Sequence, residues 1–281
     1  MTGHKGYWDR NAKRELARED DPRKQVHSDL LWREIHRCID SRKNLKILDA
    51  GAGPGRFSIP LAEAGHHVVH IDISSEMIKI AKQRINPNFS KNIIFSNSDI
   101  SQGFDYADNL FDLILCLDSP LSFCYDNYID VIKELIRIAK SKIILCVANK
   151  YGVILEDAGE FDLEHSGKLK TIKKVFRTGT LLVDEEMKKL EPGIMPSWHA
   201  FTPQELEILV RENGCHVLRI SAPGTFARFM DADLLKKLMF NKENYVDFLN
   251  FEEEFDKQKE ILSIGAIYAG GLLLSAEKNR D

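Results

Sequence analysis

Short apolar runs alternate with amphipathic stretches along most of the chain. Apolar runs bounded by glycine or polar residues predict buried parallel strands, and they cover residues 46–50, 68–72, 93–95, 111–117 and 143–147. Between these runs, apolar residues recur at intervals of three and four, which is the spacing of a helix with one buried face. The alternation of the two patterns predicts an α/β fold with a doubly wound sheet.

The predicted helices are marked by their apolar spacing and by residues that start or stop a helix. They cover residues 29–39, a stretch from Phe57 to a C-capping Gly65, residues 75–84 and residues 129–139. Nearer the C-terminus, Thr202, Pro203 and Glu205 form a capping box that starts another helix, which ends before Gly214. Strands over 217–220 and 266–276 complete the pattern.

Two segments interrupt the alternation and are predicted to form cap insertions. Residues 149–198 are expected to contain a β-hairpin, with strands at 170–176 and 181–183 around a turn at 178–179. The lysines and arginine of this segment are expected to form a solvated face, with attraction of an acidic substrate as the alternative. Residues 228–262 are expected to form a helical insertion near the substrate side, which is also a candidate homodimer surface.

The composition is that of an ordinary globular protein, and it bears on whether the protein binds nucleic acid, metal or membrane. Of 281 residues, 43% are hydrophobic and 29% are charged, and the net charge of −4 argues mildly against a nucleic-acid substrate. Five cysteines show neither a C-x-x-C pair nor metal-ligand spacing, which predicts free thiols, no metal and a reducing compartment. Neither a secretory signal nor an apolar run long enough for a bilayer is visible, so we expect a cytoplasmic protein without membrane contact.

A glycine-rich turn follows the first predicted strand and precedes a helix. Asp49 closes the strand, and glycines follow at positions 51, 53 and 55. Glycine allows positive φ and close approach of a ligand, and the N–H groups at a helix start form a polar cradle. The stretch therefore predicts a nucleotide-type ligand site.

The spacing of these glycines separates two kinds of nucleotide site. A dinucleotide fold requires G-x-G-x-x-G and places a pyrophosphate at the helix start. Here the glycines alternate, and the carboxylate of Asp49 would repel a pyrophosphate but suit an ammonium group. A second acid, Asp72, ends the next strand, where it can accept hydrogen bonds from ribose hydroxyls. A dinucleotide site remains a distant second possibility.

The pattern Asp49-x-Gly51-x-Gly53-x-Gly55 with Asp72 resembles the cofactor motifs of class I S-adenosylmethionine-dependent methyltransferases of the small-molecule type. The resemblance implies a Rossmann-like sheet of seven strands with the last strand antiparallel. It also implies S-adenosylmethionine as cofactor and S-adenosylhomocysteine as product. The cofactor contacts it implies are Tyr7, Asp49, Ala50, Gly51, Gly53, Gly55, Asp72, Ile73, Met77, Ser98, Asp99, Ile100 and Leu117.

Within this resemblance the contacts have separate roles. Asp49 would meet the methionine ammonium, Asp72 the ribose, and Asp99 with the N–H of Ile100 the adenine. Ile73 and Met77 would flank the ring, although core packing alone also explains Met77. An N-terminal segment, residues 1–28, would fold over the cofactor, with surface packing of its aromatic pair as the alternative.

Two residues are candidates for catalysis. Asp118 follows the fourth strand, and the carboxyl ends of strands border the ligand in open α/β sheets, so it is a candidate for holding or deprotonating the substrate. His199 precedes the capping box and is a candidate base near neutral pH. The alternatives are that Asp118 only caps the end of the strand and that His199 is a surface or structural residue. Enzymes that methylate the amino groups of DNA bases carry Asp/Asn-Pro-Pro-aromatic at this position. This chain has Asp-Ser-Pro-Leu there, which argues against a DNA base as the substrate.

We therefore expect a single methyltransferase domain over residues 1–281 that transfers a methyl group to an O, N or C nucleophile of a small molecule. Two alternatives stay open. One is a methyltransferase acting on RNA or protein, and the other is a non-catalytic protein that binds S-adenosylmethionine.

Overall fold

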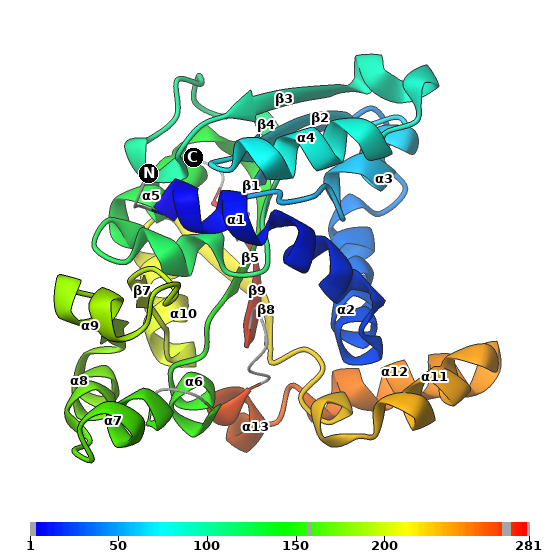
Figure 1. Ribbon diagram of the computed structural model, residues 1–281. Helices are drawn as coiled ribbons and strands as arrows, with labels where there is room; N and C mark the ends of the chain where they lie inside the picture. Colours follow the sequence, from blue (N-terminus) through cyan, green and yellow to red (C-terminus); the bar gives the residue numbers. More distant parts are fainter. Residues whose placement is uncertain (1–3, 157–158, 266–270, 280–281) are drawn as a thin grey trace.

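A seven-stranded sheet forms the centre of the computed structural model, which describes residues 4–156, 159–265 and 271–279 (Figure 1). The strand order is β3-β2-β1-β4-β5-β9-β8. The strands are β1 (Lys46–Ala50), β2 (His67–Asp72), β3 (Ile93–Asn97), β4 (Phe111–Cys116), β5 (Ala139–Val147), β8 (Cys215–Ser221) and β9 (Leu272–Lys278).

The direction of the strands confirms the predicted Rossmann-like fold with an antiparallel last strand. The first five strands pair in parallel, and β9 runs antiparallel between β5 and β8. The first part of the predicted closing strand, residues 266–270, lies outside the described residues. Because β1 to β5 are parallel, their carboxyl ends meet at one edge of the sheet, and the ligand-binding loops gather there.

Helices cover both faces of the sheet. One face packs against α2 (Pro22–Ile39), α3 (Ser58–Glu63) and α4 (Ser75–Arg84), and the other packs against α5 (Tyr128–Ile138) and α10 (Pro203–Glu212). The predicted capping box is present at α10, where Thr202 and Glu205 each bond the other's backbone N–H. Helix α2 starts at Pro22, earlier than predicted, because Asp21 caps it.

The N-terminal segment forms a helix, α1 (His4–Ala17), that packs across the start of α4. Lys5 Nζ contacts Ser75 Oγ at 2.9 Å, and Asp9 Oδ1 accepts from Ser74 Oγ at 2.7 Å. These contacts place α1 beside the residues that directly follow β2 (Figure 1, dark blue). Tyr7 is buried, and its hydroxyl accepts a hydrogen bond from Arg14 Nη2 at 3.2 Å.

The prediction of a β-hairpin at residues 170–176 is wrong. This stretch is the helix α8 (Lys170–Thr178), one of four helices with α6 (Lys150–Glu156), α7 (Glu160–His165) and α9 (Glu185–Leu190). Gly179 is the left-handed residue that ends α8, with φ +73 and its N–H bonded to Val175 O at 2.7 Å. The strand that follows, β6 (Thr180–Leu181), pairs with β7 (Trp198–His199) instead.

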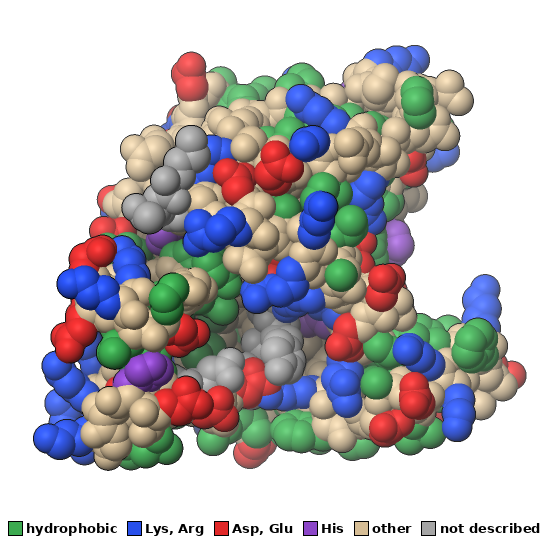
Figure 2. Space-filling view, viewed as in Figure 1, with side chains coloured by type: hydrophobic (Ala, Val, Ile, Leu, Met, Phe, Trp, Pro, Cys, Tyr) green, Lys and Arg blue, Asp and Glu red, His purple; other side chains and the backbone are tan. Residues whose placement is uncertain are grey.

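The basic residues of α8 and the loop before it form the solvated face that the sequence predicts. Figure 2 shows Lys and Arg side chains gathered at its lower left, over the α7–α8 region. The exposed basic residues there are Lys168, Lys170, Lys173, Lys174 and Arg177. The charge of α8 thus faces outward.

The second insertion is helical, as predicted, with α11 (Ala232–Phe240), α12 (Lys242–Phe255) and α13 (Lys259–Ile264). Helices α11 and α12 pack on α2, and they leave Phe229 and Phe240 79% and 90% exposed. A homodimer through this surface stays a prediction.

The five cysteines, all described, are free and buried. In the described part of the chain, every helix is too short or too polar to cross a lipid bilayer.

Candidate active site

The loop after β1 has the backbone that the alternating glycines predict. Gly51 and Gly53 both have positive φ, +78 and +56. A Cβ on Gly51 would lie 2.3 Å from Pro120, whereas a Cβ on Gly53 would meet no atom within 4 Å. Gly51 is therefore needed for a close contact inside the protein, and Gly53 leaves the backbone open to a ligand.

Asp49 lies at the end of β1 and is 1% exposed. Its Oδ2 has no hydrogen-bond partner among the described residues. Burial, with the nearby charges of Asp72 and Asp118, raises the pKa of this carboxyl to about 8. A buried acceptor oxygen without a partner fits the ammonium end of an amino-acid ligand, which would favour the ionised form.

Asp72 connects the glycine loop to the turn after β2. Its Oδ2 accepts from Gly53 N at 2.8 Å, and its Oδ1 accepts from Ser74 N at 2.8 Å. Burial raises the pKa of Asp72 to about 6, although both hydrogen bonds oppose the shift. Each carboxylate oxygen can accept a further hydrogen bond, so the side chain stands ready for hydroxyl donors at the edge of the loop.

The segment after β3 lies next to Asp72. Ser98 N donates to Asp72 O at 3.1 Å, and Asp99 caps the short helix that begins at Ile100, accepting from Ser101 N at 2.9 Å. Met77 is 3% exposed and lies in the first turn of α4, which follows the turn after β2. The structure thus gathers the predicted segments 49–55, 72–77 and 98–100 at one edge of the sheet, with α1 beside them.

The turn after β4 brings Asp118 to the same edge. Leu117 is buried, and Asp118 and Ser119 both have positive φ, +62 and +73. Such backbone is costly for residues other than glycine and tends to occur at functional sites. Pro120, the next residue, packs on Gly51, so the turn touches the glycine loop.

Three cationic or titratable side chains converge on the Asp118 carboxylate. Lys24 Nζ donates to Oδ1 at 2.7 Å, Arg56 Nη1 lies 3.4 Å from Oδ2, and His27 Nδ1 lies 3.7 Å from Oδ1. Burial alone would raise the pKa of Asp118, but Lys24, Arg56 and His27 outweigh it and hold the pKa well below its ordinary range. A carboxylate held ionised in this way is a weak base, which argues against the deprotonating role predicted for Asp118.

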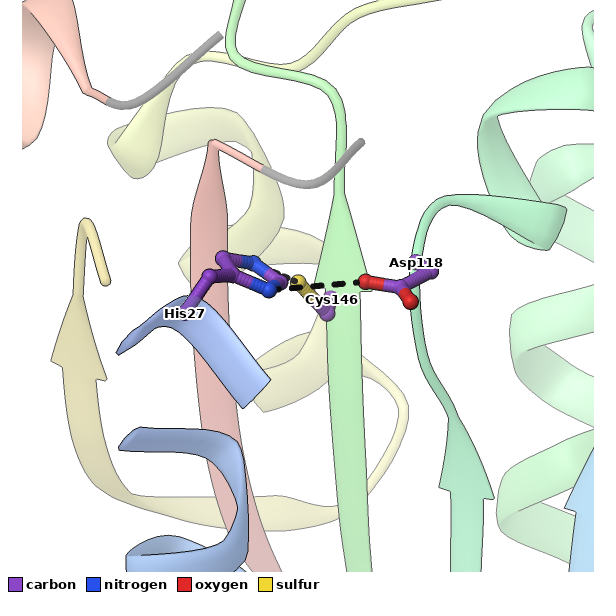
Figure 3. A group of neighbouring side chains, drawn as sticks. All are labelled: His27, Asp118 and Cys146. Carbon is purple, nitrogen blue, oxygen red and sulfur yellow. Dashed lines mark hydrogen bonds and ion pairs between the residues drawn. The ribbon is translucent and has the colours of Figure 1, made fainter. Parts of the chain in front are cut away.

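His27 also faces Cys146 of β5, with 3.9 Å between Nε2 and Sγ (Figure 3). The ligand-type atoms of His27, Asp118 and Cys146 lie within 4.8 Å of one another. Lys24 Nζ lies 2.7 Å from Asp118 and 3.4 Å from His27 Nδ1. Burial lowers the pKa of Lys24 and the Asp118 carboxylate opposes this shift, so it is the ion pair with Asp118 that favours the ammonium form here. Burial also raises the pKa of Cys146 to about 12, which keeps it a thiol. The group is thus an ion-paired cluster.

His199 lies in a different environment, on β7. Its Nε2 contacts Glu205 Oε1 at 2.9 Å, its Nδ1 contacts Thr180 Oγ1 at 2.8 Å, and its ring stacks on Tyr128 with 4.3 Å between centroids. The side chain is 2% exposed. With both ring nitrogens engaged and the ring buried, the geometry favours a structural place.

Sequence reasoning missed Lys24 and His27 and gave Arg56 no role. Lys24, His27 and Leu31 are spaced at three and four residues, so the two polar residues continue the apolar stripe of α2 toward its N-terminus. Polar residues on the buried face of a helix were the signal in the sequence that could have identified Lys24 and His27 as members of the site. Arg56 directly follows the last glycine of the loop, where its side chain reaches Asp118 and Ser28.

The sheet order and the antiparallel strand next to β5 are those of the class I methyltransferase fold. The family model of the methyltransferase domain matches residues 41–200, and the chain belongs to this family. It is therefore a methyltransferase, with S-adenosylmethionine as its cofactor.

Two relatives of known activity match different shares of the chain. The magnesium-protoporphyrin O-methyltransferase of Rhodobacter capsulatus is 31% identical over 121 residues, 43% of this chain, and the match spans about half of that relative, 53%. The tRNA 5-carboxymethoxyuridine methyltransferase of Escherichia coli K12 is 24% identical over 248 residues, covering 86% of this chain and 85% of the relative.

A solved structure supports the fold alone. The S-adenosylmethionine-dependent methyltransferase from Mesorhizobium loti superimposes with a TM-score of 0.53 at 16% identity, over 89% of this chain and 98% of that one.

Proposed function

We propose that this methyltransferase acts on a small molecule, whose nucleophile lies beside Asp118 at the end of β4. The observation that carries the proposal is the contact of the Asp118 turn with the glycine loop through Pro120. Helix α1 closes over this turn, because Trp8 packs edge-on against Phe123 at 4.9 Å between ring centroids. A site bordered by α1 and α2 suits a small acceptor better than a flat macromolecular surface.

In this proposal the cofactor contacts follow the gathered segments. Asp49 holds the methionine ammonium, the backbone of residues 50–55 lies along the methionine part, and Asp72 accepts from the ribose hydroxyls. Ile73, Met77 and the segment from Ser98 to Ile100 surround the adenine. Tyr7 closes the site from α1, and Leu117 closes it from the position directly after β4. The buried oxygen of Asp49 and the open Cβ position at Gly53 both fit this ligand.

When bound, S-adenosylmethionine supplies an electrophilic methyl group on a sulfonium. The protein then has to align the acceptor and exclude water, because proximity and orientation supply much of the rate enhancement. Asp118 orients the acceptor, and His199 is not part of the proposed machinery because its ring is engaged elsewhere.

Titration calorimetry with S-adenosylmethionine, S-adenosylhomocysteine and NAD, each separately, tests the cofactor site. We expect the two adenosyl ligands to bind and NAD not to bind. Asp72→Ala should weaken adenosyl binding by at least tenfold, since it removes the acceptor for two hydroxyls. Unchanged affinity in a folded Asp72→Ala protein would remove Asp72 from the ribose site.

RNA is the second candidate acceptor. It is favoured by the match to the Escherichia coli tRNA enzyme over most of both chains and by the exposed basic residues of α8. Filter binding of bulk tRNA between 50 and 200 mM salt tests it, because neutralised phosphates make affinity fall steeply with salt. Binding that falls steeply with salt and is lost in Lys170→Glu/Lys173→Glu/Lys174→Glu would favour RNA over a small molecule.

A further inference from the structure

Asp118 differs from the other two strand-end carboxylates in its exposure. Asp49 and Asp72 are 1% and 7% exposed, whereas the Asp118 side chain is 27% exposed. Its cationic partner Lys24 is only 7% exposed. The carboxylate is therefore the outward member of a pair whose cation is buried behind it.

The groups that face Asp118 come from four elements. Helix α2 brings Lys24 and His27, the loop after β1 brings Arg56, β5 brings the thiol of Cys146, and Asp49 on β1 adds a second acid. Ser28 fixes Arg56 through a 2.8 Å hydrogen bond, and Glu19 lies 3.6 Å from its Nε. Cations thus exceed anions directly around this carboxylate, which keeps it charged and stationary.

We propose that Lys24 is a positioning residue that holds Asp118 as a fixed hydrogen-bond acceptor beside the transferred methyl group. The acceptor of the methyl is then a nucleophile that carries an N–H or O–H. This inference rests on the proposed function and narrows its substrate class.

The chemistry balances without a strong base. The nucleophile donates its N–H or O–H to Asp118, and its lone pair points at the methyl carbon. As the bond from the nucleophile to carbon forms, the carbon–sulfur bond breaks and its electron pair stays on sulfur. For a nitrogen nucleophile, positive charge develops on nitrogen in the transition state, and the ionised Asp118 stabilises it. The proton leaves to water after transfer.

Sinefungin tests this assignment without knowledge of the acceptor. It is an analogue of S-adenosylmethionine with an amino group at the position of the transferred methyl, so its ammonium would donate to Asp118. In calorimetry at pH 7.5 we expect the wild-type protein to bind sinefungin at least tenfold more tightly than S-adenosylhomocysteine, as a charge-assisted hydrogen bond would give. Asp118→Asn should abolish this preference and leave S-adenosylhomocysteine affinity within about threefold.

The role of Lys24 has a readout that plain destabilisation would not produce. In wild-type protein the sinefungin preference should stay constant from pH 8 to pH 5, because Asp118 stays ionised. In Lys24→Met it should fall at least threefold toward pH 5, since the carboxylate loses its nearest cation and takes up a proton. Lys24→Arg should restore the constant profile. Lys133→Met, on the exposed surface of α5, is the matched control and should match wild type.

Each other outcome has a defined meaning. If neither adenosyl ligand binds the wild-type protein, the proposed function fails. If both bind but sinefungin has no preference, or keeps it in Asp118→Asn, the function stands and this inference is overturned. An equal loss of both ligands in Asp118→Asn would instead assign Asp118 to the cofactor itself. If Lys24→Met does not fold, Asp118→Glu takes its place. A sinefungin preference that exceeds that of Asp118→Asn and stays constant from pH 8 to pH 5 in Asp118→Glu would retain the inference. A preference that is no greater than in Asp118→Asn, or that changes with pH, would overturn it.

Discussion

The pKa values of the carboxylates are shifted in opposite directions at the two ends of the proposed site, the cofactor end around Asp49 and Asp72 and the acceptor end around Asp118. At the cofactor end, burial raises the pKa of Asp49 to about 8 and that of Asp72 to about 6. At the acceptor end, Lys24 and its neighbours hold the pKa of Asp118 well below its ordinary range against the effect of burial. The first set awaits a cationic or hydroxyl-bearing partner, whereas the second already has its cation within the protein.

The two ends also differ in how they are assembled. Most of the proposed cofactor end comes from one stretch, Asp49 to Ile100, in which each loop follows the strand before it; Tyr7 and Leu117 are its only proposed contacts from outside that stretch. The acceptor end joins side chains from α2, the loop after β1, the turn after β4 and strand β5. Consequently the cofactor end follows a local motif, and the acceptor end depends on tertiary packing.

The largest expected effect tests the contact that joins the two ends. Gly51→Ala should lower the free energy of unfolding by about 4 kcal/mol, because it combines positive φ with overpacking against Pro120. Gly53→Ala is the matched control: its φ is also positive but its Cβ meets no atom, so we expect about 1 kcal/mol. Denaturation by urea measures both. Equal losses would mean that Pro120 yields freely and that the two ends are not in firm contact.

The next effect concerns the buried cation of the acceptor end. Lys24→Met should lower the free energy of unfolding by about 3 kcal/mol, because it removes the nearest partner of a charged group. The double variant Lys24→Met/Asp118→Asn should lose less than the sum of the two single losses, since no unpaired charge remains. Urea denaturation of all four proteins gives the coupling energy. Simple additivity would show that the pair is not coupled in solution.

The strand-end positions of Asp49, the alternating glycines and Asp72 were predictable from the sequence because these residues lie at fixed offsets from apolar strands. Residues 170–176 were predicted wrongly as a strand because Ile172, Val175 and Phe176 favour strands locally, while their helical spacing buries Val175 and Gly179 ends the helix. The Lys24 and Asp118 pair was not predictable, since 94 residues separate its members and only the folded sheet brings them together.

The third prediction uses the pH dependence of the cofactor end. The folded-state pKa of Asp49, about 8, lies above its ordinary value of 3.8. Its contribution to stability is therefore full below about 3.8 and is lost progressively as the pH rises from there through about 8. Relative to wild type, Asp49→Asn should therefore gain stability between pH 5 and pH 7, by up to about 1.4 kcal/mol per pH unit. Urea denaturation at each pH gives the difference curve.

The contribution of Asp118 to stability changes with pH in the opposite direction to that of Asp49, so Asp118 serves as the comparison. Its lowered pKa gives a contribution that is present above the unfolded-state value and is lost as pH falls. Asp118→Asn should thus lose stability relative to wild type at pH 7, and the loss should shrink toward pH 3. If both variants followed the same pH trend, the contrast between the two ends would be wrong.

The smallest expected effect concerns His199, which belongs to neither end in this structure. His199→Phe keeps a ring to stack on Tyr128 but removes the hydrogen bonds to Glu205 and Thr180, so the free energy of unfolding should fall by about 1 kcal/mol. Calorimetry should show wild-type affinity for both sinefungin and S-adenosylhomocysteine. A variant with unchanged stability but an altered sinefungin preference would place His199 at the acceptor end, because only a ring near the methyl position changes one ligand without the other.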